Sequence, residues 1–564
     1  MLQQLYTTHG ENLKETPWTD YPRPQMRRDS YLNLNGLWDF GWNPKSCEQK
    51  IRVPFCPEST LSGIGRHFPE GSDLFYRRTV SLPEGFFRGR LLLHIGAADQ
   101  TCRVYVNGHL AGEHQSLGSF CVDVTDFWQD GDNEITIRCQ DDLKDQSFPY
   151  GKQTMKRGGM WYTPVSGIWQ TVWMESVPET YIEKLNIENR GYSVTISTEP
   201  TRNGKVIVKE LGEFTLQNGS VTITPENPHL WSPEDPWLYD FSVECGEDRI
   251  ESYFAIRSLE IRKVGKYPRL CLNGKPYFFH ALLDQGYWPD GILTPAAPEC
   301  YAEDILAMKN LGFNTLRKHI KVEAEEFYYQ CDRLGMIVFQ DMINNSDYGY
   351  VRDTVLPTIF LGYQKRSDKE LHKKDAHRQR FLDGMEATVE QLKNHPCICY
   401  WTIFNEGWGQ FDADAVYEQF KKLDDTRFVD STSGWFRQKK SDVDSRHVYF
   451  RKVNLKGDGE KPLILSEFGG KTLRVDGHVF NPDKTYGYGG CKTKEELNEA
   501  LFGLYMNEVL PCVKNGLCGA VYTQVSDVED EINGLVTYDR KVIKPDAARM
   551  RAVAEALQKA ISEK

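Results

Sequence analysis

Several signals that would assign a protein to a membrane, the cell exterior or a nucleotide are missing from this chain of 564 residues. No run of about 18 apolar residues occurs, so the sequence predicts no membrane-spanning helix. The first residues, MLQQLYTTHGENLKE, lack the basic start and the apolar stretch of a secretory signal. No glycine-rich phosphate-binding loop is present, and a net charge of −12 argues against a nucleic-acid partner.

Patterns that hold metal ions or link cysteines in small secreted domains are missing as well. The chain has 14 cysteines but no Cys-x-x-Cys pair, and several of them, such as Cys102 and Cys397, lie inside apolar runs. Such cysteines are typical of reduced core residues, so we expect a cytoplasmic protein. His319, His447 and His478 lack the spacing of metal ligands, and no His-Glu-x-x-His motif occurs. The sequence therefore predicts no metal and no other cofactor.

The composition that is present belongs to a globular protein of more than one domain. Hydrophobic residues make up 40% of the chain and charged residues 26%, while aromatics reach 12% with 13 tryptophans. A chain of this length exceeds a single hydrophobic core, so roughly two to four domains are expected. Aromatic faces stack on sugar rings, although most aromatic side chains serve packing.

The first half of the chain consists of short segments in which apolar and polar residues alternate. In residues 1–180 these segments are separated by turn signals, and Val104 and Val106 show the alternation of a half-buried strand. This pattern predicts a two-sheet β-sandwich, which serves either to bind carbohydrate or only to pack. Residues 181–262 carry shorter segments at the spacing of an immunoglobulin-like sandwich.

The pattern changes at residue 263, where apolar strand-like runs begin to alternate with amphipathic helices. This alternation is typical of a parallel α/β arrangement. Eight strands are expected at residues 277–285, 315–320, 336–342, 397–406, 427–435, 447–450, 463–469 and 519–527. Eight such steps over residues 263–564 predict a (β/α)8 TIM barrel. Too few residues separate strands five, six and seven for full helices, and the polar stretch 343–375 is expected to form a loop at the barrel rim.

Two of the predicted strands carry a glutamate near their end, close to glycine. The fourth ends with Asn405 and Glu406, and the seventh contains Glu467, with two glycines after Phe468. The carboxyl ends of barrel strands meet at one mouth, where such barrels hold their catalytic groups. Two facing carboxylates suggest glycoside hydrolysis, which needs them about 5–5.5 Å apart for retention of configuration or about 6.5–9.5 Å for inversion. The alternative is that each glutamate forms a salt bridge at the rim.

Characteristic segments occur over nearly the whole chain, among them FYRRTV and PHLWSPEDPWLY in the first half and WTIFNEGWGQ and LILSEFGG in the second. These segments resemble glycoside hydrolase family 2, which contains β-galactosidases, β-glucuronidases and β-mannosidases. The resemblance implies a jelly-roll sandwich, an immunoglobulin-like sandwich and a TIM barrel. It also implies that Glu406 is the acid/base, that Glu467 is the nucleophile and that Asn405 contacts the 2-hydroxyl of the sugar.

Aromatic residues are expected beside these groups. The resemblance implies that Tyr449 orients Glu467 and that Trp435 and Tyr522 line the sugar site. Trp408, which stands between two glycines just after Glu406, is expected to contact the substrate as well. The alternative for each of these aromatic residues is core packing.

A basic cluster at the end of the second strand bears on the choice of sugar. Its members are Arg317, Lys318, His319 and Lys321. Many β-galactosidases of the family have an Arg followed closely by Ser-His-Tyr-Pro in this place, and the chain departs from that pattern. A basic cluster suits an anionic sugar such as a hexuronate, because a carboxylate pairs with cations. The alternative is that these charges neutralise Asp341, Glu323 or the catalytic pair.

A second departure concerns the segment after the eighth strand. β-Glucuronidases of the family carry an Asn-x-Lys motif there, which holds the substrate carboxylate. The matching region of this chain has Glu531 and Asn533 and no such lysine. This disfavours a standard β-glucuronidase and leaves open a uronidase that holds its carboxylate differently, for example a β-galacturonidase.

Other polar residues are candidates for contacts with sugar hydroxyls. Asp284 lies at the end of the first strand, where a polar and aromatic stretch begins, and it is the main candidate. From the first sandwich, Asp141, Asp142 or the loop 149–153 is a candidate to reach over the barrel mouth.

Together these patterns predict a cytoplasmic, retaining exo-β-glycosidase that acts on a small-molecule glycoside or oligosaccharide. A hexuronide, either a β-galacturonide or a β-glucuronide, is the favoured substrate. The alternatives are a neutral-sugar β-galactosidase or related β-glycosidase and, from a different class, a non-catalytic carbohydrate-binding protein. The sequence leaves the linkage, the aglycone and the oligomeric state open, including a homo-oligomer.

Overall fold

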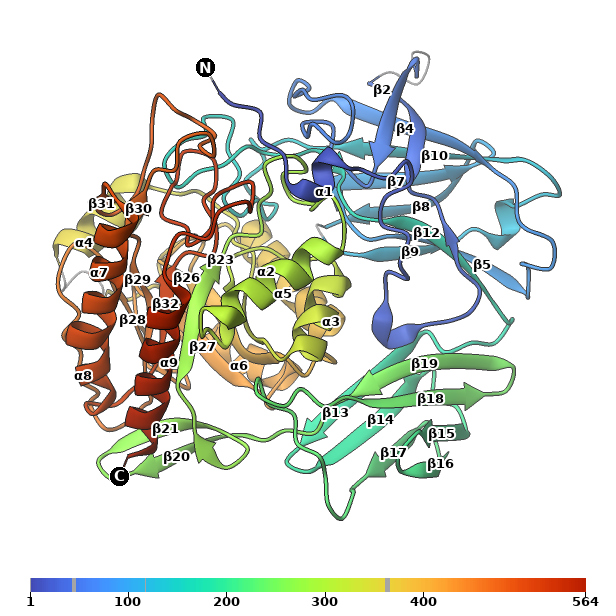
Figure 1. Cartoon of the computed structure of the whole chain (residues 1–564). Helices are drawn as coiled ribbons and strands as arrows, with labels where there is room; N and C mark the ends of the chain where they lie inside the picture. The colour runs from blue at the N-terminus through green and yellow to red at the C-terminus, as the bar shows by residue number, and fades with distance from the viewer. Residues whose placement is uncertain (1, 43–46, 117, 361–365, 564) are drawn as a thin grey trace.

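The computed structural model describes residues 2–42, 47–116, 118–360 and 366–563. Two β-sandwiches lie one above the other on the right of Figure 1, and a barrel surrounded by helices lies on the left. The all-β part precedes the α/β part along the chain, as the change in apolar periodicity predicts. The predicted fold class is confirmed.

The N-terminal sandwich contains two sheets whose apolar faces meet. Its strands are β1 (Leu32–Asn33), β2 (Gly36–Gly41), β3 (Gln49–Val53), β4 (Asp73–Val80), β5 (Arg90–Ile95), β6 (Ala98–Asp99), β7 (Thr101–Val106), β8 (His109–Gln115), β9 (Phe120–Asp123), β10 (Asn133–Gln140), β11 (Gly167–Ile168) and β12 (Val172–Val177). The sheets have the orders β3-β2-β4-β10-β7-β8 and β1-β12-β5-β9, and β6 pairs with β11. Along β10, Ile135 and Ile137 are buried and Thr136 between them is partly exposed, so one strand face forms the core.

The second sandwich has seven strands, the number of a constant-type immunoglobulin domain. Their bounds are β13 (Lys184–Arg190), β14 (Ser193–Glu199), β15 (Gly204–Val208), β16 (Gly212–Leu216), β17 (Ser220–Ile223), β18 (Tyr239–Cys245) and β19 (Asp248–Phe254). They form the sheets β13-β14-β17 and β16-β15-β18-β19. Ile196, Val243 and Ile250 are fully buried between the two sheets.

A small antiparallel sheet covers the bottom of the barrel. It consists of β20 (Leu259–Val264), β21 (Tyr267–Leu272) and β22 (Lys275–Pro276). Arg269 donates to the carbonyl oxygens of Val513 and Leu517, which lie at the amino-terminal end of the last barrel strand. The opposite end of the barrel is therefore the open one.

Eight parallel strands form the barrel, and all eight predicted strands are confirmed. They are β23 (Phe279–Asp284), β24 (Thr315–Lys318), β25 (Ile337–Asp341), β26 (Ile398–Asn405), β27 (Phe428–Ser433), β28 (Asp444–Val448), β29 (Leu463–Gly469) and β32 (Leu517–Thr523). Their order is β27-β26-β25-β24-β23-β32-β29-β28. Every residue of β26 is buried, because helices cover the outside and side chains fill the inside.

Strands β27 and β28 lie at the two ends of this order, and the described residues show no ladder of backbone hydrogen bonds between them. We call this gap the seam, and hydrogen bonds of Asp442 bridge it. The Asp442 N–H donates to the carbonyl oxygen of Val429 over 2.9 Å. The Asp442 carboxylate accepts from the Val429 N–H at 2.8 Å and from the Tyr417 hydroxyl at 2.6 Å. The seam lies next to the fourth strand, because β27 is the neighbour of β26, and Glu406 directly follows β26.

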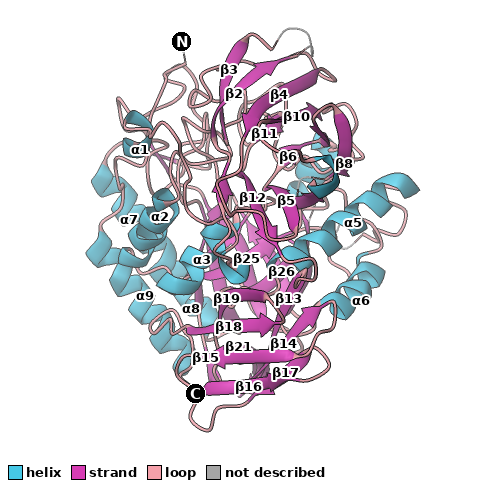
Figure 2. Ribbon diagram, turned by 90° about the vertical axis from the view of Figure 1, so that its right-hand side faces the viewer, coloured by secondary structure: helices cyan, strands magenta, loops and turns pink. Residues whose placement is uncertain are grey.

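Helices surround the barrel strands, as Figure 2 shows. They are α2 (Glu299–Asn310), α3 (Glu325–Leu334), α4 (Leu356–Ile359), α5 (Asp375–Leu392), α6 (Ala413–Leu423), α7 (Lys494–Leu504), α8 (Leu510–Val513) and α9 (Ala547–Ser562), while α1 (Thr8–Glu11) lies in the N-terminal segment. No helix separates β27, β28 and β29 in the fully described stretch 428–469, as predicted. Within the described ranges, every helix is too short or too polar to span a lipid bilayer.

The predicted rim loop at 343–375 is only partly irregular. Residues Tyr350–Val355 form a wide helical turn that continues into α4. Residues 361–365 lie outside the described residues. A second long segment follows the seventh strand. It contains a short parallel pair of strands, β30 (Thr472–Leu473) and β31 (Gly490–Cys491).

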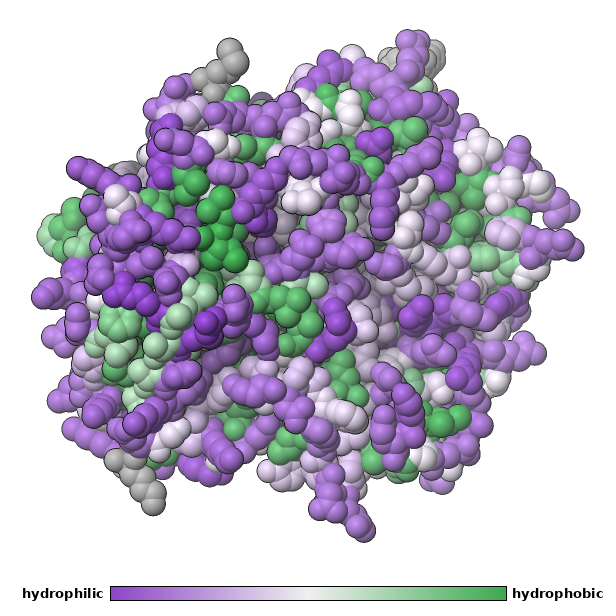
Figure 3. Space-filling model, viewed as in Figure 1, coloured by the Kyte–Doolittle hydropathy of each residue, from purple (hydrophilic) through white to green (hydrophobic). Residues whose placement is uncertain are grey.

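Buried polar networks join the three parts of the molecule. Arg28 pairs with Glu175 of the N-terminal sandwich and with Asp248 of the second sandwich. The Tyr253 hydroxyl of the second sandwich donates to Asp332 at the end of α3, over 2.7 Å. The outer surface is mostly hydrophilic on the face that Figure 3 shows, with apolar residues scattered among polar ones.

Candidate active site

Glu406 enters the barrel mouth through a sharp turn at the end of β26. Its backbone has a φ of +50° and its N–H donates to the Ser433 carbonyl oxygen of the next strand at 2.9 Å. Gly407 follows with a φ of +77°, and a Cβ there would lie 2.3 Å from the Phe436 ring. Glycine is therefore required for the turn that aims the Glu406 side chain into the mouth.

Glu467 projects from β29 and is held on both carboxylate oxygens. Its Oε1 accepts from Nη1 of Arg317 at 3.1 Å, and its Oε2 accepts from the Tyr449 hydroxyl at 2.8 Å. Its side chain is 6% exposed. These bonds fix the carboxylate in position and favour its charged form.

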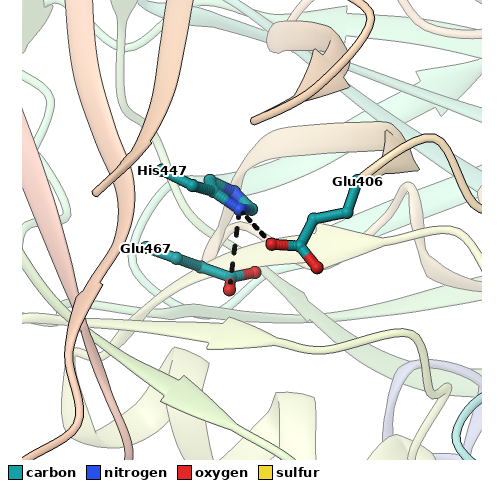
Figure 4. A group of neighbouring side chains, drawn as sticks. All are labelled: Glu406, His447 and Glu467. Carbon is teal, nitrogen blue, oxygen red and sulfur yellow. Dashed lines mark hydrogen bonds and ion pairs between the residues drawn. The ribbon is translucent and has the colours of Figure 1, made fainter. Parts of the chain in front are cut away.

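His447 lies between the two glutamates, as Figure 4 shows. Its Nδ1 is 2.8 Å from Oε1 of Glu406 and 3.7 Å from Oε2 of Glu467, while its Nε2 is 2.9 Å from the Ser433 hydroxyl. One carboxylate oxygen of each glutamate and the histidine nitrogen lie within 4.8 Å of one another. The fold thus brings together the two carboxylates that the sequence pairs.

His447 is a member of the site that is not among the residues predicted for it, since the sequence shows it only as a histidine without the spacing of a metal ligand. Tyr449 was expected to point at Glu467, and residues two apart on a strand face the same way. His447 stands two residues before Tyr449 and pairs in register with Glu467 across β28 and β29. This alternation is the signal that identifies it.

The three ligand-type side chains Glu406, His447 and Glu467 are close enough for a cation to bridge them. However, the guanidinium of Arg317 and the hydroxyl of Tyr449 already donate to the two oxygens of Glu467. The arrangement fits a pair of reacting carboxylates better than a metal centre.

The environment moves the pKa values of the two glutamates in opposite directions. Burial and the charge of Glu467 raise the pKa of the Glu406 carboxyl. Burial also acts to raise the pKa of Glu467, but His447 and Arg317 outweigh it, so that this pKa is lowered. Glu406 is thereby suited to hold a proton and Glu467 to remain ionised.

Arg317 connects Glu467 to the rest of the site. It donates through Nε to Asp341 at 2.9 Å, through Nη1 to the Ser466 carbonyl oxygen at 3.0 Å, and through Nη2 to Oδ1 of Asn405 at 2.8 Å. Nδ2 of Asn405 is buried and has no partner among the described residues. Asn405 therefore offers a free donor beside Glu406, in the place where a sugar hydroxyl was expected.

The other members of the basic cluster form hydrogen bonds and ion pairs with carboxylates inside the protein. Lys318 Nζ donates to Asp284 at 2.6 Å and to Glu323 at 3.0 Å. Lys321 Nζ donates to Glu323 at 2.8 Å and to two backbone carbonyl oxygens. His319 lies 2.8 Å from Asp341, and burial lowers its pKa to about 4.

This corrects the sequence-based interpretation of the cluster as a clamp for a sugar carboxylate. Arg317 and Lys318 are 1% exposed, and their donors already meet Asp341, Glu467 and Glu323. A buried cation with two carboxylate partners has little charge left for a substrate. The contacts favour the alternative of internal charge balance.

Asp284 and the end of the eighth strand form two further polar groups at the mouth. Asp284 accepts from Lys318 and, at 2.9 Å, from the Gly286 N–H, and its side chain is 11% exposed. Beyond β32, Glu531 accepts from the Asn533 amide at 2.9 Å and from the Tyr162 hydroxyl at 2.5 Å. The Asn533 side chain is thus part of an internal network that includes the N-terminal sandwich.

The predicted aromatic residues separate into two groups. Trp408 follows Glu406 by two residues, and the centroid of the Trp435 ring lies 5.5 Å from that of the His447 ring. The indole N–H of each tryptophan is buried without a partner among the described residues. Tyr449 contacts Glu467 directly. Tyr522, in contrast, is 0% exposed and accepts from the Lys471 N–H, with its ring packed against Gly469. The expectation that Tyr522 lines the sugar site is corrected, because the residue lies in the barrel core.

The N-terminal sandwich reaches the barrel rim through one of the segments proposed for it. The Tyr150 N–H donates to the Asn344 carbonyl oxygen at 3.1 Å and its hydroxyl donates to the Ser346 carbonyl oxygen at 2.7 Å. The loop 149–153 therefore docks on the segment that follows β25. Asp141 instead binds the Gly71 N–H of its own sandwich through its carbonyl oxygen.

Family models match most of the chain outside the N-terminal sandwich. The model of the TIM barrel domain of glycosyl hydrolases family 2 matches residues 271–559, and a second model of glycosyl hydrolases family 2 matches residues 179–257.

Curated relatives are similar at low identity. The chain is 24% identical, over 70% of its length, to a β-galactosidase of Thermoanaerobacter pseudethanolicus, and 22% identical, over 68%, to a β-glucuronidase of Bacteroides fragilis. The alignments span 53% and 56% of these relatives, so the chain matches about half of their length.

Solved structures share the fold over nearly the whole chain. A β-D-glucuronidase of Dictyoglomus thermophilum superposes with a TM-score of 0.72 at 19% identity, covering 95% of this chain and 98% of that chain. A family 2 β-galacturonidase from Eisenbergiella tayi superposes with a TM-score of 0.67 at 18% identity, with the same coverage. The barrel model alone spans more than half of the sequence, and the chain belongs to glycosyl hydrolases family 2.

Proposed function

We propose that this protein is a retaining exo-β-glycosidase in which Glu467 is the nucleophile and Glu406 the acid/base. The observation that carries the proposal is that one carboxylate oxygen of each glutamate lies within 4.8 Å of one oxygen of the other, together with the opposite shifts of their pKa values. Retaining enzymes hold their two carboxyl groups about 5–5.5 Å apart, whereas inverting enzymes need about 6.5–9.5 Å to admit a water.

The first step breaks the glycosidic bond. A carboxylate oxygen of Glu467 forms a bond to the anomeric carbon, while the leaving oxygen departs and takes the proton of Glu406. The product is an ester between the sugar and Glu467, and Glu406 is left as a carboxylate. Arg317 and Tyr449 hold Glu467 in the charged form that this attack needs.

The second step reverses the roles. Glu406 removes a proton from water, and the hydroxyl oxygen bonds to the anomeric carbon as the ester bond to Glu467 breaks. The sugar leaves with its β-configuration, and Glu406 is protonated again. The free amide donor of Asn405 is placed to bind a hydroxyl next to the reacting carbon.

We extend the proposal to a terminal hexuronide as the substrate. Relatives of the chain are named β-glucuronidase and β-galacturonidase, which supports an anionic sugar. The second candidate is a neutral β-galactoside, because Lys318 and Lys321 are neutralised internally and one relative is named β-galactosidase. A non-catalytic carbohydrate-binding role is less suited to a site that keeps both carboxylates.

A reducing, cytoplasmic location is part of the same proposal. All 14 cysteines are free thiols, including several that are buried in the domain cores. Free core thiols are typical of proteins in a reducing compartment.

The test of the mechanism uses aryl β-glycosides with Glu406→Ala and Glu467→Ala. Each variant is expected to lose activity by about 10³-fold or more on the wild-type substrate. Azide should restore turnover in both, giving a β-glycosyl azide with Glu406→Ala and an α-glycosyl azide with Glu467→Ala. The same azide configuration from both variants, or full activity in either, would contradict the assignment.

A further inference from the structure

One buried cation near the catalytic mouth has no counter-ion. Lys152, in the loop 149–153 of the N-terminal sandwich, is 7% exposed. No hydrogen bond or ion pair joins its Nζ to any residue in the part of the chain that the structure describes. A buried ammonium group without a partner is costly, so its retention needs a reason.

The other buried lysines show the contrast. Lys318 and Lys321 pair with Glu323, and Lys544 pairs with Asp527 at 2.6 Å. Each of these three side chains therefore has a carboxylate within ion-pair distance. Lys152 differs from them in its missing partner and not in its depth.

The position of Lys152 directs its charge toward the reacting groups. Its Nζ lies 5.8 Å from the ring centroid of Trp408, which follows Glu406 by two residues. It lies 5.6 Å from the ring centroid of Tyr162, and the lysine lines one small cavity with His319 and Gln285. The charge of Lys152 acts to lower the pKa of both Glu406 and Glu467.

The surroundings of Lys152 leave its charge available to a ligand. The loop that carries it is fixed to the rim by the bonds of Tyr150 to Asn344 and Ser346, so the lysine is held in place. The neighbouring His319 is neutral near pH 7, because burial lowers its pKa to about 4. A carboxylate brought here by a substrate would meet an ammonium group in a largely dry environment, where the pair is strong.

We infer that Lys152 binds the carboxylate of a hexuronide and thereby sets the preference of the enzyme for an anionic sugar. This inference rests on the proposed function, because the sugar must occupy the site of Glu406 and Glu467. It assigns recognition of the sugar carboxylate to the N-terminal sandwich. The basic cluster of the second barrel strand then serves to balance buried carboxylates inside the protein.

The experiment compares Lys152→Met and Lys152→Arg with the wild type on paired 4-nitrophenyl substrates. The pairs are galacturonide with galactoside and glucuronide with glucoside, which differ only at the carboxylate. For Lys152→Met we expect kcat/KM to fall by about 100-fold on the preferred uronide, the usual result of removing one partner of a buried charge pair, and by less than about threefold on the neutral sugar. Lys152→Arg should recover part of the loss.

Lys156→Met is the matched control, because Lys156 lies in the same region of the sandwich but is exposed. Its kinetics should equal those of the wild type. Thermal unfolding and circular dichroism of each variant establish that the loop change leaves the fold intact. Equal losses on the uronide and the neutral sugar, with a shifted pH profile, would overturn the inference in favour of a purely electrostatic effect on the glutamates.

Calorimetric titration with free galacturonate, glucuronate and galactose tests binding without turnover. Wild type should bind one of the two hexuronates more tightly than galactose, and Lys152→Met should lose that difference. An active wild type that binds galactose as well as both hexuronates would overturn the role of Lys152 and leave the glycosidase proposal standing. An inactive wild type that still binds a hexuronate through Lys152 would overturn the proposed activity alone.

Discussion

At the residue scale, Arg317 shows how one buried cation organises several acceptors. Its guanidinium reaches Asp341, Glu467 and Asn405 at once through three separate nitrogens of a planar fork, whereas a lysine donates from a single nitrogen. The orientation of Glu467, the proposed nucleophile, and of the free Asn405 donor therefore depends on the same side chain.

Replacing Arg317 with lysine should therefore impair the site without removing its charge. We expect kcat/KM to fall by about 100-fold, because Asn405 and one oxygen of Glu467 lose their donors. Steady-state kinetics checks the loss, with Arg474→Lys at an exposed Asp476 pair as the control. Kinetics unchanged by Arg317→Lys would mean that charge alone suffices.

His447 is a positioning residue, and its replacement should be visible in the pH profile. The bond and charge of His447 act to lower the pKa of Glu406, and its charge acts to lower that of Glu467. Without them both values rise. In His447→Asn the acid limb, which needs ionised Glu467, and the alkaline limb, which needs protonated Glu406, should both move to higher pH.

The measurement is kcat/KM against pH for the wild type and His447→Asn. Ser433→Ala is the matched control, because it removes the bond to Nε2 but leaves the imidazole facing the glutamates. A uniform loss of rate with unmoved limbs would assign His447 a purely structural role.

The proposed contact of Asn405 with the sugar can be tested with a substrate that lacks the 2-hydroxyl. Its unpaired amide donor should bind the 2-hydroxyl, an interaction that strengthens in the transition state. Asn405→Ala and a 2-deoxy substrate should each lower kcat/KM, and the two changes combined should cost little more than either alone. Losses that simply add would show that the two groups do not meet.

At the element scale, the seam between β27 and β28 replaces a strand ladder with the contacts of Asp442. The carboxylate accepts from the Val429 N–H and the Tyr417 hydroxyl and pairs with Lys421 at 3.3 Å. The seam bears on the proposed catalysis because Ser433 and His447, which contact Glu406, lie on its two sides.

Asp442→Ala should destabilise the protein by about 2 kcal/mol, because it leaves the Val429 N–H without its acceptor. Denaturant unfolding measures the loss, and hydrogen exchange should be faster at the Val429 amide. Asp425→Ala is the control, because its side chain is 50% exposed and pairs only with Arg190 among the ion pairs of the described residues. Equal losses in both variants would contradict a special role of the seam.

The elements of the barrel also show how much of the fold and of the candidate site could be predicted from the sequence. Strands buried on both faces read as continuous apolar runs, so all eight barrel strands and the positions of Glu406 and Glu467 were accessible from local patterns. The place of Lys152 at the barrel mouth depends on the docking of its loop on a distant segment, which no local pattern encodes, whereas His447 was accessible from its alternation with Tyr449. The fate of Lys318 and Lys321 was likewise undecided, because Glu323 competes with a substrate for their charge.

At the scale of the whole molecule, Glu175 holds the N-terminal parts together. It is fully buried and pairs with Arg23, Arg28 and His94, and Arg28 continues to Asp248 of the second sandwich. Burial acts to raise the pKa of Glu175, but Arg23, His94 and Arg28 outweigh it and lower the pKa far below its usual value.

The linkage between this pKa and stability has a defined sign. A lowered pKa in the folded state stabilises the protein at neutral pH, and that contribution is lost as the pH falls below about 4.3 toward the lowered value. Glu175→Gln should lower the free energy of unfolding at pH 7 by about 3 kcal/mol and should flatten its decline in acid. Unfolding curves at several pH values test this, with the exposed Glu179→Gln as control. A parallel decline in both variants would remove Glu175 from the acid response.

The docking of loop 149–153 on the barrel rim also has a consequence for how such enzymes diverge. Bond cleavage is assigned to the ends of two barrel strands, whereas the charge of Lys152 arrives from a domain made earlier in the chain. Changes in that loop can then alter which sugar is accepted without disturbing the glutamates. Among relatives with the same barrel, the sequence of the N-terminal loop would then determine the preferred sugar, and the barrel would determine the reaction.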